Sequence, residues 1–291
     1  MNKKVITGLG VLGGGAIALI FGGQAVVSHV AAKEIDKAIE EVSPFVNVEY
    51  KNVKSSFLGK GTQVNDVVIT PVDSGETINV DKIIVYGFDT KDDIPTELNM
   101  AIKGMSLPTA SLGENAAMFS ELGYDQDISV DFATDYAYEE GNQTLRLKQF
   151  KMGADDVGAV EMSVHLTNVS LDPQAVASLP LSLFGAEFHG ATLSYNDDSL
   201  MTRILDTTAA AEGVSVKDVK TEMAAGLFSD PAVSEAFTPE QRKEIEKFID
   251  NPKAFTISMA PSEPVAFTSL MTTAGDTGAI AQLLNVSFKA N

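Results

Sequence analysis

Apolar and polar residues follow three successive patterns along the chain, and the first is a continuous apolar run. Residues 5–27 contain no charged residue and come directly after Lys3 and Lys4. A helix of this length extends about 34 Å, which is enough to cross a hydrocarbon core of roughly 30 Å. Residues 1–32 are therefore predicted to be an N-terminal transmembrane anchor or an export signal.

The residues around this run indicate on which side of a membrane the rest of the chain lies. Because positive charge is retained in the cytoplasm, the two lysines hold the N-terminus there and send the remainder across. Gly23 and Ala25 have the spacing of a signal-peptidase site, and cleavage of residues 1–25 would make the protein secreted. The apolar run continues past this site, which favours the anchor. Gly10 and Gly14 have the G-x-x-x-G spacing of closely packed helices, although a glycine-rich segment also produces it by chance.

From residue 46 onward, apolar residues recur at every second position, which is typical of strands with one buried face. Residues 33–43, just before them, have helical spacing and end at Pro44. The alternating segments lie near residues 46–50, 78–88, 98–102, 128–138, 145–152, 160–166 and 188–195. Within 78–88 the alternation assigns Ile84 and Tyr86 to the apolar face. The pattern predicts a twisted antiparallel sheet, interrupted by a short helical insert near residues 111–122.

One predicted hairpin carries two further local signals. Glu140, Gly141 and Asn142 supply a turn after the clearest alternating segment. Beyond the turn, the apolar positions change parity once between Leu147 and Phe150, which predicts a β-bulge in the second strand.

The third pattern, after residue 196, is helical. Asp197 or Asp198 is expected to cap a helix that stops at Gly213, and Ser215 and Thr238 each begin a capping box. A strand near 255–259, a helix near 267–284 and a strand near 286–288 follow. The predicted class is α+β, with an N-terminal membrane helix, a twisted antiparallel β-sheet body and a helical C-terminal portion returning to the sheet. The predicted domains are an anchor at 1–32, a β-rich extracytoplasmic domain at 33–196 and a helical subdomain at 197–291.

Composition excludes several classes of protein. The formal net charge is −19, and all 40 acidic residues follow residue 32. A surface this acidic repels nucleic acid, so no nucleic-acid partner is expected. The chain has no cysteine, which excludes disulfides, thiolate metal sites and cysteine nucleophiles.

Candidate chemistry is sparse. His29 adjoins the apolar run, His165 lies on the polar side of its strand and His189 precedes Gly190, and none has the spacing of a zinc site. Serine-nucleophile motifs and a phosphate-binding glycine loop are absent from the sequence. We therefore predict a non-catalytic protein without a cofactor or metal. Carboxylates can also be brought together by folding alone, without a sequence motif.

The N-terminal quarter of the chain resembles YdgA-like bacterial envelope proteins and, more loosely, AsmA-like proteins. The resemblance rests on Met1-Asn2-Lys3-Lys4, Val48-Glu49-Tyr50-Lys51-Asn52-Val53, Ser56-Phe57-Leu58-Gly59 and Val68-Ile69-Thr70-Pro71. Residues 193–200 and 251–253 are similar to C-terminal modules of bacterial envelope proteins. These resemblances imply a single helix in the bacterial inner membrane, a periplasmic body and, for AsmA-like relatives, an apolar sheet face that shelters lipid chains.

An apolar sheet face must be covered by helices, a second sheet, a partner or a ligand. The candidate apolar groove consists of the large side chains expected on that face: Tyr86, Phe88, Met100, Phe132, Tyr136, Met162 and Phe188. They form an ordinary core, a lipid-lined groove or a face for another protein. The expected function is a non-catalytic, membrane-anchored envelope protein that shelters lipid or another apolar ligand. The alternative is a structural or assembly subunit whose exposed sheet edges pair between copies or with an envelope partner.

Overall fold

A computed structural model describes residues 35–36, 39–40, 43–55, 61–72, 75, 77–88, 96–124, 127–170, 183–229, 237–273 and 276–290. The predicted anchor or signal at 1–32, with Gly10 and Gly14, lies outside these residues. The chain divides into two compact units, Met1–Asp135 (unit 1) and Tyr136–Asn291 (unit 2). The domain boundary predicted near residue 196 stays a prediction.

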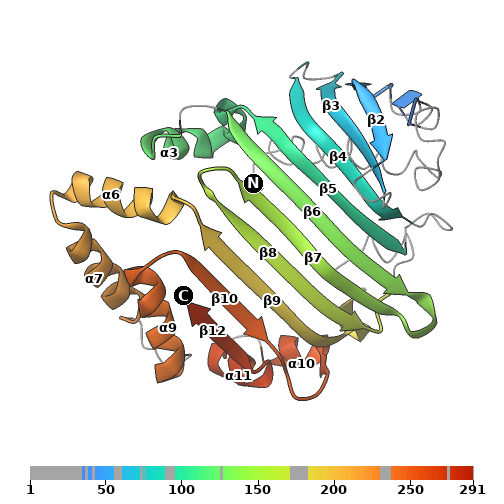
Figure 1. Ribbon diagram of the computed structural model, residues 1–291. Coiled ribbons are helices and arrows are strands. Elements are labelled where there is room, and N and C mark those ends of the chain that lie inside the picture. Colours follow the sequence, from blue (N-terminus) through green and yellow to red (C-terminus); the bar gives the residue numbers. More distant parts are fainter. Residues whose placement is uncertain are drawn as a thin grey trace. The chain divides into compact units, whose positions relative to one another are not determined.

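Unit 1 is built from antiparallel strands in the order β1-β3-β4-β5-β6, with β2 also paired to β3 (Figure 1). The strands are β1 (Val46–Glu49), β2 (Asn52–Ser55), β3 (Thr62–Pro71), β4 (Ile78–Phe88), β5 (Glu97–Leu107) and the first part of β6 (Ile128–Glu139). A 3₁₀ helix, η2 (Thr109–Asn115), and the helix α3 (Ala116–Glu121) separate β5 from β6. They confirm the helical insert predicted in this region.

The core of unit 1 is a single aliphatic cluster on one face of these strands. Val67 and Val80, from neighbouring strands, are 1% and 2% exposed. Ile35 also belongs to the cluster and is helical, as predicted for residues near 33–43. The neighbouring Asp36 accepts a hydrogen bond of 2.6 Å from the Tyr50 hydroxyl. Burial together with this carboxylate raises the pKa of Tyr50 to about 12.

A line of backbone irregularities crosses the middle of unit 1 and changes which residues are buried. Asp66 on β3 and Gly104 on β5 both have positive φ, 50° and 62°. The backbone N–H of Gly104 donates to Asp131 Oδ1 at 2.9 Å. On β4, beyond this line of irregularities, the odd-numbered Ile83 is buried, whereas the even-numbered Tyr86 is 45% exposed. The predicted placement of Tyr86 on the apolar face of β4 is therefore wrong, because the irregularity reverses the alternation there.

Unit 2 continues from the last residues of β6 in the strand order β6-β7-β8-β9-β10-β12, with β11 paired to β9. Its strands are β7 (Thr144–Ala154), β8 (Gly158–Thr167), β9 (Glu187–Asp197), β10 (Ala254–Met259), β11 (Val265–Ala266) and β12 (Val286–Ala290). The 3₁₀ turn η3 (Glu140–Asn142) joins β6 to β7, and the register of β7 shifts between Leu147 and Phe150. The structure thereby confirms both the predicted turn and the predicted bulge.

The helices of unit 2 begin and end mostly where the capping signals predicted. They are α6 (Leu200–Glu212), α7 (Val216–Leu227), α9 (Pro239–Asp250), α10 (Phe267–Thr272) and α11 (Thr277–Leu283), with the 3₁₀ turn η4 (Leu183–Gly185) before β9. Ser215 and Thr238 form capping boxes, and Gly213 ends α6 with φ 68°. The cap of α6 is Ser199, although Asp197 accepts a hydrogen bond from Met201 N–H. Two short helices replace the single one expected over 267–284.

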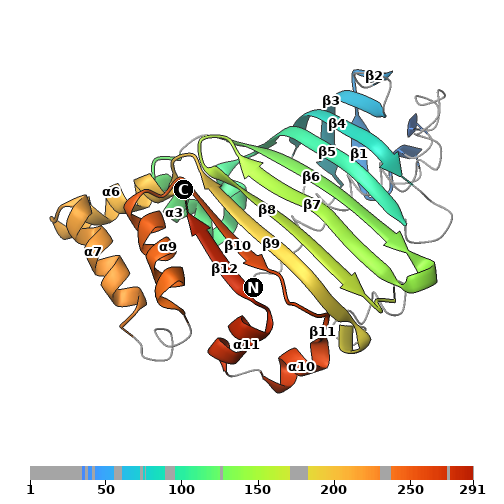
Figure 2. The same cartoon turned by 60° about the horizontal axis from the view of Figure 1, so that its bottom comes forward.

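Helix α9 lies along the outer edge of β12, and three of its side chains hydrogen-bond to the backbone of that strand (Figure 2). Gln241 Nε2 donates to Val286 O at 2.6 Å, and Lys247 Nζ donates to Ala290 O at 2.6 Å. The Ala290 N–H donates to Glu244 Oε2 at 2.7 Å. Because the three side chains recur every third residue, they share one face of α9 and occupy backbone groups that an edge strand leaves free.

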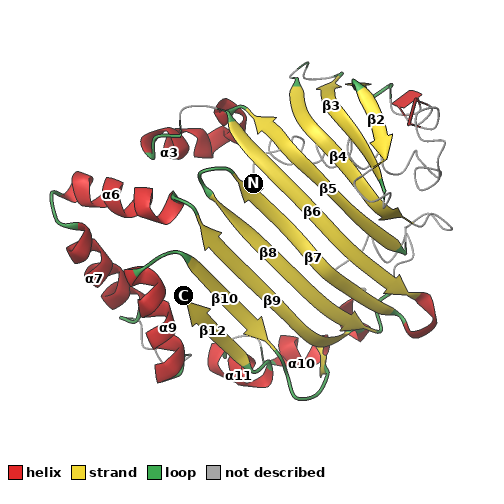
Figure 3. Ribbon diagram, in the orientation of Figure 1, coloured by secondary structure: helices red, strands yellow, loops and turns green. Residues whose placement is uncertain are grey.

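The α+β class predicted from the sequence is wrong. The described chain is dominated by antiparallel strands, twelve in all, and the C-terminal segment itself contributes β10, β11 and β12 (Figure 3). Strands β3 to β9 are ten to twelve residues long, whereas α10 and α11 have only six and seven residues. Within the described ranges, no helix combines the length and the apolar content needed to cross a bilayer.

Candidate functional site

The sheet of unit 2 has an apolar face and a polar face, which strand alternation separates. On β8, Met162 and Val164 belong to the apolar face, and Ser163 and His165 to the polar face. Cross-strand register extends each set: Met162 pairs with Leu193, and both lie on the apolar face. The two faces offer different chemistry.

The apolar face is covered at its two ends. At one end, α10 and α11 pack over a buried cluster that includes Leu166 and Phe188. At the other end, α9 places Phe248 against Phe255, with ring centroids 5.2 Å apart, and Phe255 stacks on Phe288 at 5.6 Å. Figure 2 shows α9 and the α10–α11 pair at these separate positions. The helices of unit 2 therefore cover the apolar face in two places.

Between these covers, the apolar side chains are only partly buried or are exposed. A row of directly paired residues crosses β7, β8, β9 and β10, namely Phe150, Met162, Leu193 and Ile257. Leu193 is 37% exposed, and Met152, two residues beyond Phe150 on β7, is 48% exposed. We call these five residues the apolar strip. A partly exposed row of large apolar side chains on a face that helices cover elsewhere is a candidate contact surface.

The seven residues predicted to form an apolar groove are divided between the units. Met100 is buried in the core of unit 1 with Phe132 packed against it, whereas Phe188 is buried in the core of unit 2. Met162 belongs to the apolar strip, Tyr136 lies in unit 2 and is partly buried, and Tyr86 is exposed. Burial raises the pKa of the Tyr136 hydroxyl. The side chain of Phe88 lies outside the described set.

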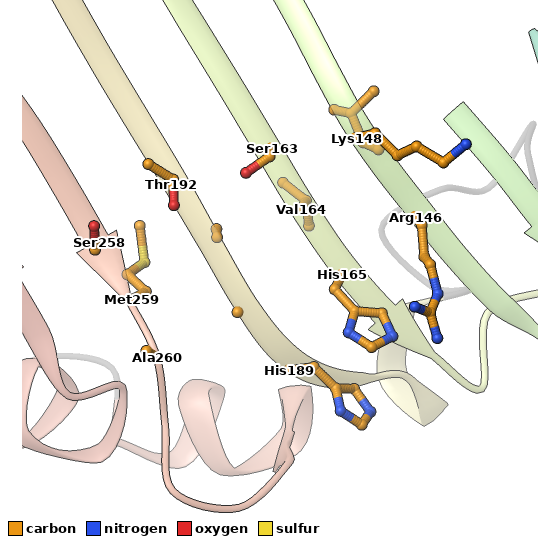
Figure 4. A pocket seen from close by; sticks show the side chains of 13 residues that line it. Arg146, Lys148, Ser163, Val164, His165, His189, Thr192, Ser258, Met259 and Ala260 are labelled. Carbon is orange, nitrogen blue, oxygen red and sulfur yellow. The ribbon is translucent and has the colours of Figure 1, made fainter. Parts of the chain in front are cut away.

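The polar face contains a pocket of about 390 Å³ (Figure 4). Its polar lining comes from strands β7 to β10 and consists of Arg146, Lys148, Ser163, His165, His189, Thr192 and Ser258. Figure 4 shows the Arg146 guanidinium beside the His165 ring, with the His189 ring next to both. The three hydroxyl side chains continue the lining from the histidines toward β10. The pocket thus has a cationic end and a hydroxyl-lined end.

Two register shifts lie beside this pocket. One is the bulge of β7 between Leu147 and Phe150. The other is on β9, where His165 pairs with Gly190 but Leu166 pairs with Phe188, so that His189 is the extra residue. A bulge turns a side chain away from its regular alternation, and here it brings His189 beside His165. Gly190, which pairs with His165, has no side chain, and a Cβ there would lie 3.1 Å from Met259 O.

The two imidazoles stack, and hydrogen bonds orient one of them. Their ring centroids are 4.4 Å apart with an interplanar angle of 27°. His189 Nε2 and Thr167 Oγ1 are 2.9 Å apart, and the same hydroxyl lies 3.3 Å from Glu187 Oε2. Both hydrogen bonds form when Nε2 of His189 carries a proton and donates it to Thr167, and Thr167 donates to Glu187.

His165 has no such partner. Its Nε2 atom is buried and has no hydrogen-bond partner in the part of the chain that the structure describes. Desolvation, followed by the nearby His189 and Arg146, lowers the pKa of His165 below its ordinary value of 6.5, and Glu139 opposes this shift. Near neutral pH, the His165 ring is therefore uncharged and available as a hydrogen-bonding group.

The part of the chain that the structure describes contains no cluster of potential metal ligands. No group of three or more histidine, aspartate or glutamate side chains there is arranged to hold an ion. The sequence prediction of a non-catalytic, cofactor-free protein stays a prediction.

The C-terminal part of the chain matches a model of a protein family. A family model described as "Uncharacterized protein" matches residues 151–291. No curated protein matches the chain. The matched region begins inside β7, so it contains His165 and His189 but not Arg146. It does not bear on the resemblance to YdgA-like or AsmA-like proteins, which stays a prediction.

Proposed function

We propose that this chain is a non-catalytic binding protein whose unit 2 shelters an apolar ligand, a lipid acyl chain, against the apolar strip. The observation that carries the proposal is the exposure of Leu193, 37%, between the two covered ends of the face, together with that of Met152, 48%, on β7 of the same face. Each buried methylene group of an acyl chain contributes about 0.8 kcal/mol, so a strip that contacts several of them binds measurably.

The shape of the strip supports an elongated ligand. Its four paired residues follow one another across four strands, which are spaced about 4.8 Å apart, so the row extends roughly 14 Å. This length matches an acyl segment of about ten to twelve carbons. Met152 and Met162 add flexible side chains that adapt to irregular apolar surfaces.

The test is displacement of a fluorescent fatty acid from the full chain, together with native mass spectrometry for adducts of lipid mass. We expect Met152→Gln and Leu193→Gln each to weaken binding of the fatty acid severalfold. The matched controls are Lys151→Gln and Thr192→Gln, which introduce the same residue at adjacent positions on the polar face. Equal affinities in all four variants, or no fatty-acid binding by the unmodified chain, would contradict the proposal.

The second candidate function is assembly through a sheet edge, and an exposed apolar pair in unit 1 favours it. Phe45 and Val72 are 77% and 56% exposed, and Val72 N–H donates to Phe45 O at 3.1 Å. They adjoin β1, whose only described partner strand is β3. If copies of the chain associate there, Phe45→Ser lowers the mass measured by light scattering, whereas Gln143→Ser, at the β6–β7 turn, does not.

The envelope location and the export or anchoring of the chain stay predictions, because they depend on residues 1–32. Fractionation of cells producing the full chain tests them. Recovery of the intact chain in the cytoplasmic soluble fraction would contradict both.

A further inference from the structure

We propose that the polar pocket of unit 2 is a binding site for a small organic anion, whose carboxylate or phosphate group is held by Arg146 and the histidine pair. The pocket lies on the face of the sheet opposite the apolar strip. The two sites therefore depend on different residues, and the inference does not rest on the proposed lipid binding.

Arg146 is the first reason to expect an anion. Its guanidinium forms no ion pair or hydrogen bond with any residue in the described ranges, although the chain carries 40 acidic residues. Arg203, by contrast, pairs with Asp156 at 2.7 Å. The five N–H donors of a guanidinium match carboxylate and phosphate oxygens in paired geometry. Among the described residues, Arg146 is thus an unpaired cationic side chain in the lining of the pocket.

His165 is the second reason. Among the described residues its buried Nε2 lacks a hydrogen-bond partner, and a buried polar atom left without one destabilises the folded state. An oxyanion beside it removes this destabilisation by accepting a hydrogen bond from the ring. The register places Arg146 directly opposite His165 on the neighbouring strand, so one ligand group reaches both.

The rest of the pocket indicates what the anionic group is attached to. A volume of about 390 Å³ exceeds that of a bare inorganic anion. Ser163, Thr192 and Ser258 extend the lining away from the cationic end and provide both donors and acceptors. They suit a ligand with hydroxyl groups beside its charged group. The net charge of −19 repels large polyanions, which favours a small ligand over a nucleic acid or an acidic protein.

The test follows the histidine ring protons by NMR in the full chain. The chain has only three histidines, so His165→Gln and His189→Gln assign the resonances. The probes are sodium sulfate, sodium acetate and glycerol 3-phosphate, each compared with sodium chloride at equal ionic strength. We expect the His165 and His189 resonances to shift with all three probes, and glycerol 3-phosphate to bind at least severalfold more tightly than sulfate because it also engages the hydroxyls.

Two charge-matched variants on β7 separate specific binding from screening. Arg146→Gln removes the fork, and we expect sulfate and glycerol 3-phosphate to bind at least tenfold more weakly, the effect of losing a charge-assisted hydrogen bond. Lys151→Gln removes one positive charge from the same strand outside the pocket, and we expect less than a twofold change. Equal effects of both variants, or equal shifts with chloride, would overturn the proposal. His165→Gln provides the same comparison if circular dichroism shows that Arg146→Gln does not fold.

The pH dependence gives a second readout, with sulfate as the probe because its charge is constant between pH 5 and pH 8. Arg146 on β7, His189 on β9 and Glu139 on β6 face His165. A bound dianion favours the protonated ring, so sulfate should raise the titration midpoint of His165 and bind more tightly as the pH falls below about 6.5. His165→Gln should flatten this dependence. A midpoint unchanged by saturating sulfate would overturn the proposal.

One further arm identifies the source of the ligand. Vesicles containing phosphatidylglycerol present a similar phosphate on a membrane surface. Binding of soluble glycerol 3-phosphate without binding of the vesicles supports a soluble ligand, as proposed. Binding of the vesicles alone, with no response to any soluble anion, overturns it.

Discussion

In unit 1 the apolar residues of β1, β3, β4 and β5 gather in one cluster, in which Val67 and Val80 are 1% and 2% exposed, whereas in unit 2 they divide into two covered ends with Leu193 exposed between them. Both units began from the same sequence signal, an apolar residue at every second position. Alternation therefore predicts which side chains share a face, but not whether that face is covered. Cover depends on elements elsewhere in the chain, such as α9, α10 and α11 in unit 2.

The largest expected effect comes from truncating one apolar residue in each unit. Ile83→Ala in unit 1 should lower the free energy of unfolding by about 2–4 kcal/mol, because it leaves a cavity in a buried cluster. Leu193→Ala in unit 2 should cost less than about 1 kcal/mol, because the side chain is already 37% exposed. Urea unfolding followed by far-ultraviolet circular dichroism measures both. Equal losses would mean that the apolar strip is as well packed as the core of unit 1.

The second prediction concerns the backbone irregularities of unit 1. Gly104 has φ 62°, and an added Cβ would lie 2.9 Å from Asp81 Cβ, so Gly104→Ala should destabilise the protein by about 1–3 kcal/mol. Gly87→Ala, in the neighbouring strand β4, meets no atom within 4 Å and should have little effect. The same unfolding experiment compares them. Equal losses of stability in the two variants would show that the positive φ of Gly104 and its closeness to Asp81 do not exclude a side chain at position 104.

The third prediction uses the helix that covers the edge of unit 2. The hydrogen bond from Ala290 N–H, with a smaller contribution from Lys247, lowers the pKa of Glu244. A lowered pKa stabilises the folded state above the unfolded value of about 4.5, and this contribution is lost as the pH falls through the folded pKa. Glu244→Gln should therefore be less stable than the unmodified chain at pH 7, and the difference should shrink at pH 3. The control is Glu246→Gln, which changes an exposed carboxyl of the same helix. At pH 7 it should lower stability less than Glu244→Gln does.

The smallest expected effect concerns the Tyr50–Asp36 hydrogen bond of unit 1. Tyr50→Phe should cost less than about 1 kcal/mol, because the bond is exposed to solvent. The raised pKa, about 12, means that the bond stabilises the fold below pH 10 and that this contribution disappears as the pH rises through 12. Unfolding at pH 7 measures the loss. An increase in stability on substitution would show that this contact does not hold the helical residues near Asp36 against the strands of unit 1.

Much of the secondary structure could be predicted from local signals. The turn at residues 140–142, the bulge in β7, the capping boxes at Ser215 and Thr238 and the stop at Gly213 were all predicted correctly, because each depends on a few neighbouring residues. The fold class was wrong because the length of an element and the sheet to which it adds depend on distant residues. β3 was not identified as a strand, since Asp66 interrupts its alternation.

The polar pocket illustrates the same limit. The alternation of apolar and polar residues predicts His165 on the polar side of its strand, and the structure agrees. His189 stands out in the sequence only as the residue before Gly190. What the sequence did not show is that the two lie together. Their stacking requires the β8–β9 pairing and the extra residue in β9, and neither leaves a spacing motif. Arg146 was not singled out, although an arginine on the polar side of a predicted hairpin strand, opposite a histidine, is the signal that would have found it.

The hydrogen bonds between α9 side chains and the backbone of β12 also limit the stoichiometry of any association through strand edges. Growth of a fibre requires each copy to offer two free edges, one to receive a neighbour and one to pass the contact on. Where Gln241, Glu244 and Lys247 occupy the backbone of β12, that edge is closed, and the described edge left open is that of β1 and β2. Copies that join there meet about a two-fold axis and stop at a closed pair.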